Sequence, residues 1–231
     1  MSYDALLDDL LSLSHAETSA AKSATALELV FEGDVDSLRL LLQQERKELL
    51  VNARDPHSGR ALLHEACAEG HLDVVKFLLE KTDADLMLRT MLGRSTPLHV
   101  AVTCNRRAIV FLLLSHGADA LSRDRFGCSP MHYVKSLSVA KLLIQYGGQV
   151  LDYNSKCKNA LESVLVVVES GDVEDEAARR NFQKFLKRQA EVEYKSKLDK
   201  LKQIKRQQLK DQHGDKSSPG RSKLRKKLTE V

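Results

Sequence analysis

One stretch of the chain recurs three times at nearly constant intervals. It is clearest from Gly93 to Asp119, where a Thr-Pro-Leu-His start precedes two short apolar segments and a Gly-Ala-Asp end. Threonine and proline favour a helix start, and Asn105 suits a chain reversal because asparagine tolerates positive φ. Gly117 favours the end of a second helix. Each copy is therefore predicted to form a helix, a tight turn, a helix and a loop.

Related stretches begin at Gly59 and Gly127, each 34 residues from Gly93. At about residues 25–170 the chain resembles the ankyrin repeat family, whose pattern is G-x-T-P-L-H-x-A-A-x-x-G-H, then V-V-x-L-L, then G-A-D. The resemblance implies an all-α fold, an ankyrin-repeat solenoid of stacked helix-turn-helix units with hairpin loops. A long basic helix is expected to follow it.

Three departures from this pattern predict local differences. Ala61 and Leu62 replace the Thr-Pro pair, which weakens that helix start. Residues 82–84 hold one residue more than the pattern. The third repeat is about three residues short after His132 and lacks the Gly-His turn, so we expect it to be distorted.

The chain is expected to divide into four parts. Residues 1–23 form an acidic, leucine-containing helix and a linker, and residues 24–171 form the repeat domain. The repeat domain contains a capping unit at 25–50, repeats at about 55–89, 90–123 and 124–152, and a degenerate unit at 153–171. Residues 172–213 form a long charged helix with a weak coiled-coil pattern, and residues 214–231 form a disordered basic tail.

Leucines near the N-terminus form a second pattern. In a helix, Leu6, Leu7, Leu10 and Leu11 share one face, and Leu7-Asp8-Asp9-Leu10-Leu11 matches an L-x-x-L-L groove-binding pattern. One interpretation is a helix that docks into a partner's groove. The other is a flap that covers the first helices of the array or stays mobile.

The net charge of +4 hides a strong asymmetry. Residues 1–178 carry a net charge of −8, whereas residues 179–231 carry +12. This split predicts an acidic partner for the C-terminal part. The residues predicted to bind a polyanion are Lys205, Arg206, Arg221, Lys223, Arg225, Lys226 and Lys227. Their charges are equally typical of a nuclear-import signal, a contact with nucleic acid or an anionic surface, or plain solvation.

Targeting and redox features are few. No apolar run approaches the roughly 18 residues that a membrane span needs, and the acidic N-terminus argues against a signal peptide. We therefore expect a cytoplasmic or nuclear protein. The four cysteines lack C-x-x-C spacing and are expected to be free thiols.

No motif predicts catalysis, a cofactor or a metal. His64-Glu65 fails the H-E-x-x-H zinc pattern because position 68 is alanine, and His64, Cys67 and His71 make only a weak ligand set. His64, His99 and His132 recur at one register, which favours hydrogen bonds to the backbone. We therefore expect a non-enzymatic protein without a cofactor or metal.

The loops supply the candidate partner-binding residues. Arg54, Arg89 and Arg123 occupy one aligned position, and the family resemblance places such positions at hairpin tips beside a concave, protein-binding groove. The alternative is that basic residues are simply common there. Replacing Arg89 and Arg123 by alanine is expected to weaken partner binding without affecting folding. The full candidate set is Arg54, His57, Arg89, Met91, Leu92, Arg123, Arg125 and Phe126.

These observations favour a non-catalytic adaptor or scaffold that binds another protein through the groove, with the basic tail as a second contact. The alternative is a nuclear regulator that associates with nucleic acid or another polyanion through that tail. The long charged helix also contains three apolar residues that need an apolar surface against which to be buried, namely Phe182, Phe185 and Leu186.

Overall fold

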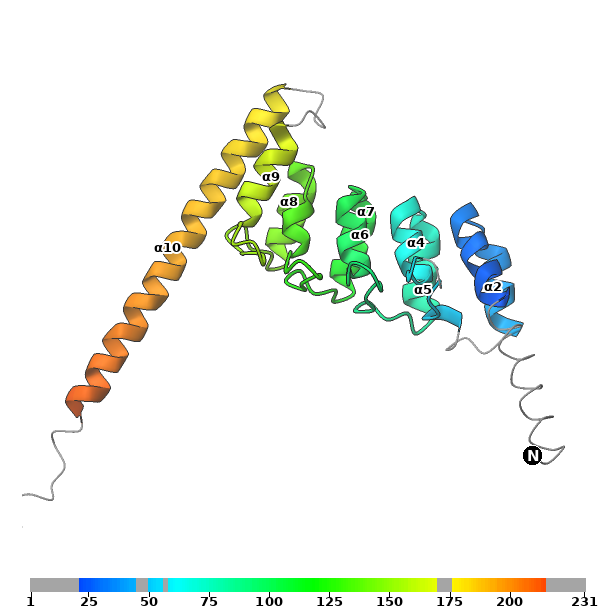
Figure 1. The fold of residues 1–231 in the computed structure, drawn as a ribbon, viewed down its shortest axis with the longest axis horizontal. Helices are drawn as coiled ribbons and strands as arrows, with labels where there is room; N and C mark the ends of the chain where they lie inside the picture. Colours follow the sequence, from blue (N-terminus) through cyan, green and yellow to red (C-terminus); the bar gives the residue numbers. More distant parts are fainter. Residues whose placement is uncertain (1–20, 45–49, 56–57, 170–175, 215–231) are drawn as a thin grey trace, which may run out of the picture. The chain divides into compact units, whose positions relative to one another are not determined.

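The structure is a computed structural model that describes residues 21–44, 50–55, 58–169 and 176–214 (Figure 1). Within these ranges regular structure is helical, apart from two isolated β-bridges, Arg54–Ala61 and Tyr153–Asn159. The all-α prediction is therefore confirmed. The predictions for residues 1–20, for His57 and for residues 215–231 concern parts of the chain outside the described residues.

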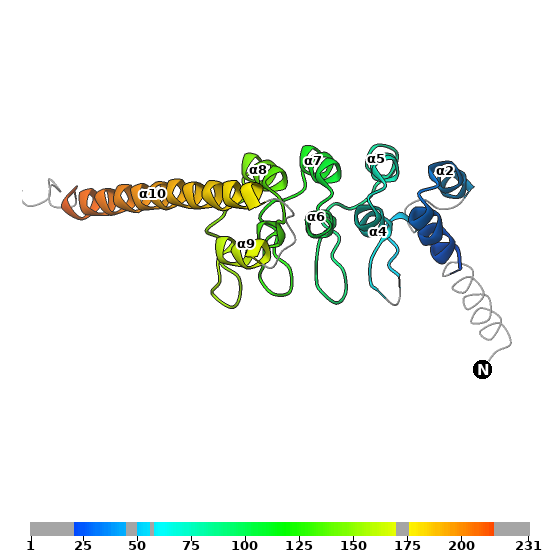
Figure 2. The ribbon, with the colours of Figure 1, turned by 90° about the horizontal axis from the view of Figure 1, so that it is seen from above.

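The helices form two layers with hairpin loops along one side. Figure 2 shows α5, α7 and α8 in an outer layer and α4, α6 and α9 in an inner layer, from which the loops project. Residues 21–32 are helical and precede α2 (Val35–Gln44). The remaining elements are α4 (Leu62–Glu69), α5 (Leu72–Lys81), α6 (Pro97–Thr103), α7 (Arg107–Ser115), the 3₁₀-helix η1 (Pro130–Tyr133), α8 (Leu137–Gln145), α9 (Ala160–Glu169) and α10 (Glu176–Gly214).

Left-handed residues make the tight reversals between the helices of a pair. Gly70 between α4 and α5 has φ 93°, and Asn105 between α6 and α7 has φ 55°. The reversal predicted at Asn105 is confirmed. The third repeat lacks such a residue, and its first helix is the single 3₁₀ turn η1, followed by extended Val134. This shortening is the distortion that its missing residues predict.

Apolar side chains fill the space between the two layers. Leu98 of the inner layer and Leu113 of the outer layer are almost completely buried. Leu112, in contrast, is only half-buried on the outer side of α7. Burial of one such leucine contributes roughly 1.5–3 kcal/mol, so the core of each repeat holds its neighbours together. The other large side chains with almost no exposure include Leu38, Leu62, Leu78, Ile109, Met131 and Leu143.

A buried histidine in α6 connects its repeat to the next hairpin. His99 Nδ1 accepts hydrogen bonds from the Thr96 N–H at 3.3 Å and the Thr96 hydroxyl at 2.8 Å. A backbone N–H only donates, so the ring proton lies on Nε2, which donates to the Cys128 carbonyl at 3.1 Å. The Thr-Pro-Leu-His sequence therefore both starts a helix and joins two repeats.

Its counterparts show how far this link extends. His64 Nδ1 accepts from the Ala61 N–H at 3.2 Å, and Nε2 donates to the Ser95 carbonyl at 3.1 Å. His132 Nδ1 accepts from the Ser129 N–H at 3.1 Å, and the ring interacts with the Lys158 backbone, although Nε2 lacks a hydrogen bond of standard geometry within the described ranges. The backbone role expected for these histidines is therefore seen, and it weakens in the shortened third repeat.

The last helix belongs to two compact units. One unit comprises residues 1–187 and the other residues 188–231, so their boundary lies inside α10. In the first unit, Phe182 and Leu186 are buried, and the ammonium group of Lys141 lies 5.6 Å from the Phe185 ring centroid. The first turns of α10 thus bury two of the three apolar residues for which the sequence analysis expected an apolar surface, and Phe185 is half-buried.

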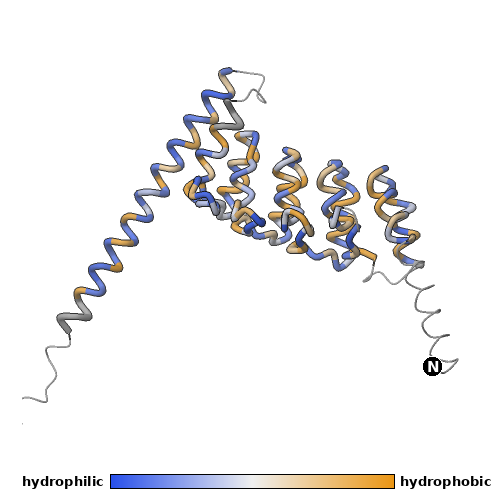
Figure 3. The backbone as a smooth tube through the Cα atoms, in the orientation of Figure 1, coloured by the Kyte–Doolittle hydropathy of each residue, from blue (hydrophilic) through white to orange (hydrophobic). Residues whose placement is uncertain are grey.

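The rest of α10 is strongly hydrophilic. Figure 3 shows mainly hydrophilic residues along it, with scattered apolar positions. Across the part of the chain that the structure describes, none of the helices has the length and apolar character required to span a membrane.

Candidate functional site: the groove and the hairpin tips

Short polar side chains hold the hairpins in shape. In the second hairpin the Thr90 N–H donates to the Ser95 carbonyl at 3.0 Å, and the Ser95 N–H donates to Thr90 Oγ1 at 3.1 Å. In the third, Asp124 Oδ1 accepts the N–H groups of Phe126 and Cys128 at 2.8 and 2.9 Å. These bonds satisfy the backbone within each loop, so the tips are preorganised.

The glycines of the repeats do not share one structural register. Gly59 and Gly127 adopt left-handed backbone with φ 65° and 70°, but in the second hairpin Arg94 does so, with φ 52°. Gly93 lies one residue earlier, although the equal sequence intervals align it with the other two. In the second hairpin three residues separate Thr90, whose N–H closes the hairpin, from the left-handed Arg94. In the third hairpin only two residues separate Asp124, whose N–H closes it, from the left-handed Gly127.

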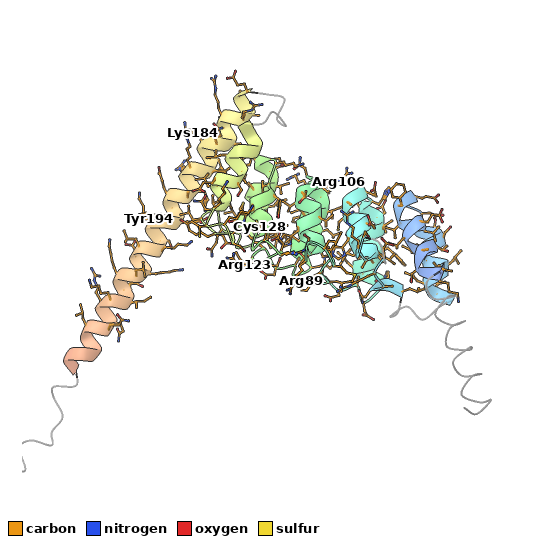
Figure 4. All side chains as sticks on the ribbon, viewed as in Figure 1. Arg89, Arg106, Arg123, Cys128, Lys184 and Tyr194 are labelled. Carbon is orange, nitrogen blue, oxygen red and sulfur yellow. The ribbon has the colours of Figure 1, made fainter. Side chains whose placement is uncertain are left out.

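The aligned arginines connect successive hairpins. Arg89 Nη1 donates to the Arg123 carbonyl at 2.6 Å, and Arg123 Nη1 donates to the Gly127 and Tyr153 carbonyls at 2.8 and 2.6 Å. Arg123 Nη2 also pairs with the Asp152 carboxylate. Figure 4 shows Arg89 and Arg123 in neighbouring loops. Both guanidinium groups thus contact the array itself, a role that the sequence analysis did not assign to them.

The hydrophobic members of the candidate set are open to solvent. Met91, Leu92 and Phe126 are 64, 69 and 56% exposed. Arg125 brings their two hairpins together, since its N–H donates to the Gly93 carbonyl at 2.8 Å and its Nη1 to the Leu92 carbonyl at 3.4 Å. The structure thus gathers the candidates of the second and third hairpins into one surface.

Arg54 belongs to the first hairpin, which precedes the two hairpins of this surface. It is exposed at the base of the first hairpin, where its backbone forms the bridge with Ala61. The position of His57 lies outside the described residues. The first hairpin therefore contributes no described apolar tip comparable to that of the second.

A groove runs between these hairpins and the inner helices. Its cavity of about 430 Å³ has Leu92 and Phe126 on the hairpin side and Thr103, Cys104 and Tyr133 on the helix side. Sequence reasoning missed the last three. Their signal in the sequence is positional, because each lies at the C-terminal end of the first helix of its repeat.

Tyr133 and Asp124 form the polar floor of the groove. The Tyr133 hydroxyl donates to Asp124 Oδ2 at 2.5 Å. Burial and the neighbouring Asp124 carboxylate raise the pKa of Tyr133, so its hydroxyl remains a donor at neutral pH. The same carboxylate also accepts the N–H groups of the third hairpin, so Asp124 connects Tyr133 in the groove to the tip of that hairpin.

The other candidate sites have different surroundings. Lys205 and Arg206 are exposed on α10, whereas the remaining predicted polyanion-binding residues lie outside the described ones. Both ring nitrogens of His64 contact the backbone, and His71 Nε2 lies 2.9 Å from the Phe31 carbonyl. Among the residues that the structure describes, no cluster of three histidine, cysteine or acidic side chains is arranged to hold a metal ion.

The comparisons with known proteins agree with this architecture. The profile for ankyrin repeats in three copies matches residues 4–90 and 26–124. Among similar proteins, Rabankyrin-5 of Mus musculus is 32% identical over 171 residues, which cover 71% of this chain and 14% of that protein. The transient receptor potential cation channel subfamily A member 1 of Drosophila melanogaster is 29% identical over 143 residues, covering 59% and 12%.

A bacterial relative shows the same kind of partial match. The putative ankyrin repeat protein YahD of Escherichia coli (strain K12) is 37% identical over 97 residues, which cover 38% of this chain and 48% of YahD. The match therefore spans less than half the length of each of these three relatives. Together with the stacked helix pairs, histidine links and hairpins, the profile match shows that the chain belongs to the ankyrin repeat family, whose repeats generally mediate protein–protein interaction.

Proposed function

We propose that this chain is a non-catalytic adaptor or scaffold that binds a protein partner through the groove and the tips of its second and third hairpins. The supporting observation is the exposure of Met91, Leu92 and Phe126 beside a groove of about 430 Å³. Large apolar side chains at the rim of a concave surface are suitable interface anchors, because a partner removes them from water.

The charges around the tips suggest the chemistry of that partner. Arg94 and Arg125 are exposed in the same two hairpins as the apolar tips. The Asp124 carboxylate, in contrast, is buried in hydrogen bonds to its own loop and to Tyr133. The surface therefore suits a segment with apolar side chains next to carboxylates. Because the hairpins are already ordered, binding requires little loss of backbone entropy.

The test is affinity purification with a variant of the hairpin tips. Met91→Asp combined with Phe126→Asp is expected to abolish capture of a stoichiometric partner that the unaltered chain retains. Leu201→Asp is the matched control, since Leu201 is a similarly exposed apolar residue of α10. Equal capture by all three folded proteins would remove the hairpin tips from the proposal.

A second candidate function is association with nucleic acid or another polyanion in the nucleus. The supporting observation is the net charge of +12 on residues 179–231, with Lys205 and Arg206 exposed on α10. The two functions are compatible, because the groove and the basic segment use different residues. Under either function we expect the chain in the cytoplasm, the nucleus or both.

A further inference from the structure

The outer layer of helices carries a second cavity, on residues that the groove does not use. It has a volume of about 550 Å³ and lies on α5, α7 and α8. Its lining is apolar with two cations and contains no carboxylate. The principal lining residues are Leu72, Phe111, Leu112 and Leu142, with Lys76 and Arg107.

Phe111 is unusual for its place in the repeat. It follows the fully buried Val110 of α7, just as Lys76 follows Val75 in α5. The equivalent residue of α8, after buried Ala140, is Lys141. An outward-facing position that carries lysine in both flanking repeats thus holds a phenylalanine that is 51% exposed. Packing of the array does not require this ring, which favours a role in binding.

We propose that this outer cavity binds the chain's own N-terminal segment, residues 3–11. The segment reads Y-D-A-L-L-D-D-L-L, in which a helix would place its leucines on one face and aspartates on both flanks. That face offers the i, i+3 and i+4 anchors with which amphipathic helices fill apolar grooves. This proposal is independent of the function assigned to the concave groove.

The charges of the two surfaces are complementary. The segment carries Asp4, Asp8 and Asp9 and no basic residue. Helices α7 and α8 contain no acidic residue, and Lys76 and Arg107 lie among the apolar lining residues. The two carboxylates of α5, those of Asp73 and Glu80, lie outside the cavity lining. An acidic, leucine-rich segment therefore fits this cavity better than a basic one.

The connecting chain is long enough for the segment to reach the cavity. His71 Nε2 lies 2.9 Å from the Phe31 carbonyl, so the helix at residues 21–32 ends beside the start of α5, next to Leu72. Residue 21 is then roughly 15 Å from Phe31 at 1.5 Å per helical residue. Residues 12–20 span up to roughly 30 Å when extended. A tether of this length gives the segment an effective concentration near the millimolar range, which favours it over a free helix of similar chemistry.

Photo-crosslinking of the full chain tests the proposal. Phe111 is replaced by p-benzoylphenylalanine, a change that its exposure should permit without loss of folding. Irradiation is expected to join this position to residues 2–14 of the same chain, with a yield independent of protein concentration. The same probe at Leu92, on a hairpin tip, is the control and should give no such product.

Charge exchange gives a second readout. Asp8→Lys with Asp9→Lys is expected to reduce the crosslink about three- to tenfold, because the exchange removes the attraction to Lys76 and Arg107 and adds repulsion. Adding Lys76→Glu and Arg107→Glu to that variant should restore much of the yield. Loss without restoration would show that the cations are not the partners of the aspartates.

Three results would overturn the proposal. Crosslinked dimers whose yield rises with concentration would assign the cavity to a second copy. A crosslink to residues 2–14 from a probe at Leu40 of α2, but not at Phe111, would place the segment on the first repeat. Absence of a crosslink to residues 2–14 from Phe111, in a chain with unchanged melting, would leave the cavity to a different partner.

Discussion

At the scale of single residues, the aligned arginines combine exposure with a structural role. The Arg123 side chain is 48% exposed, yet it contacts two carbonyls and the Asp152 carboxylate. Arg89 reaches the carbonyl of Arg123 itself, so consecutive hairpins are linked in series. An exposed guanidinium in this array is therefore not automatically available to a partner.

Arg123→Ala is expected to lower the free energy of unfolding by about 1 kcal/mol. The loss is modest because solvent screens a half-exposed pair, while the carbonyls regain water as a partner. Lys156→Ala is the control, because Lys156 is an exposed loop residue, and we expect it to change stability by less than about 0.5 kcal/mol. Denaturant titration measures both variants, and equal stabilities would show that the arginine contacts contribute nothing.

The buried histidines predict a pH dependence of stability. Burial lowers the pKa of His64 to about 4, and it also lowers the pKa values of His99 and His132. Below pH 6.5 the unfolded chain takes up protons that the folded chain does not, so stability falls as the pH falls. For His64 the loss is on the order of 3 kcal/mol by pH 4 and does not grow further below that pH.

Denaturant titrations between pH 7 and pH 4 measure this effect. Carboxylates also titrate in that range, so the comparison is with His64→Asn, which should show a shallower fall. Identical profiles for His64→Asn and the unaltered chain would contradict a neutral, buried His64.

The sequence predicted the positions of the candidate site better than their contacts. The repeat period placed Met91, Leu92 and Phe126 in the hairpins, where the structure has them exposed. It did not predict that Arg89 and Arg123 bond to carbonyls, because the direction of a carbonyl depends on the loop's backbone angles. The spacing of glycines also misaligned the second hairpin, since a left-handed residue there need not be glycine.

At the scale of elements, local patterns predicted each helix pair and the weakness of the third repeat. The missing residues after His132 leave space for only the 3₁₀ turn η1 before α8. The division of α10 was not predictable in the same way. The sequence analysis placed a domain boundary at the start of this helix, before residue 172, but its first turns bury Phe182 and Leu186 within the unit that contains the repeats.

Phe182→Ala is expected to destabilise this unit by about 3–5 kcal/mol, the usual cost of removing a buried aromatic ring. Val192→Ala is the control from the same helix, because Val192 is exposed. Thermal unfolding measures both variants. Removal of residues 188–231 should leave the melting temperature unchanged, whereas a chain that ends before α10 should melt at a lower temperature. Equal melting of the two truncated chains would show that the first turns of α10 do not stabilise the repeats.

At the scale of the whole molecule, the chain combines two sequence segments of opposite net charge. Residues 1–178 carry −8 and include the groove, whereas residues 179–231 carry +12. The repeat residues 24–171 themselves are nearly neutral, with 17 Lys/Arg and 18 Asp/Glu, so a contact with polyanions is expected from the basic part. The ordered hairpins and the basic segment can therefore select partners of different chemistry without sharing residues.

The basic part is expected to bind duplex DNA without sequence preference. Affinity should fall with salt, with a log–log slope near −0.9 for each phosphate neutralised, because binding releases condensed counterions. Fluorescence anisotropy with two duplexes of unrelated sequence, over a series of salt concentrations, measures both properties. Removing residues 205–231 should abolish most of this binding without changing the melting of the repeats, while Met91→Asp should leave it intact. Salt-insensitive binding, or a strong preference for one duplex, would contradict a purely electrostatic contact and indicate a built recognition site.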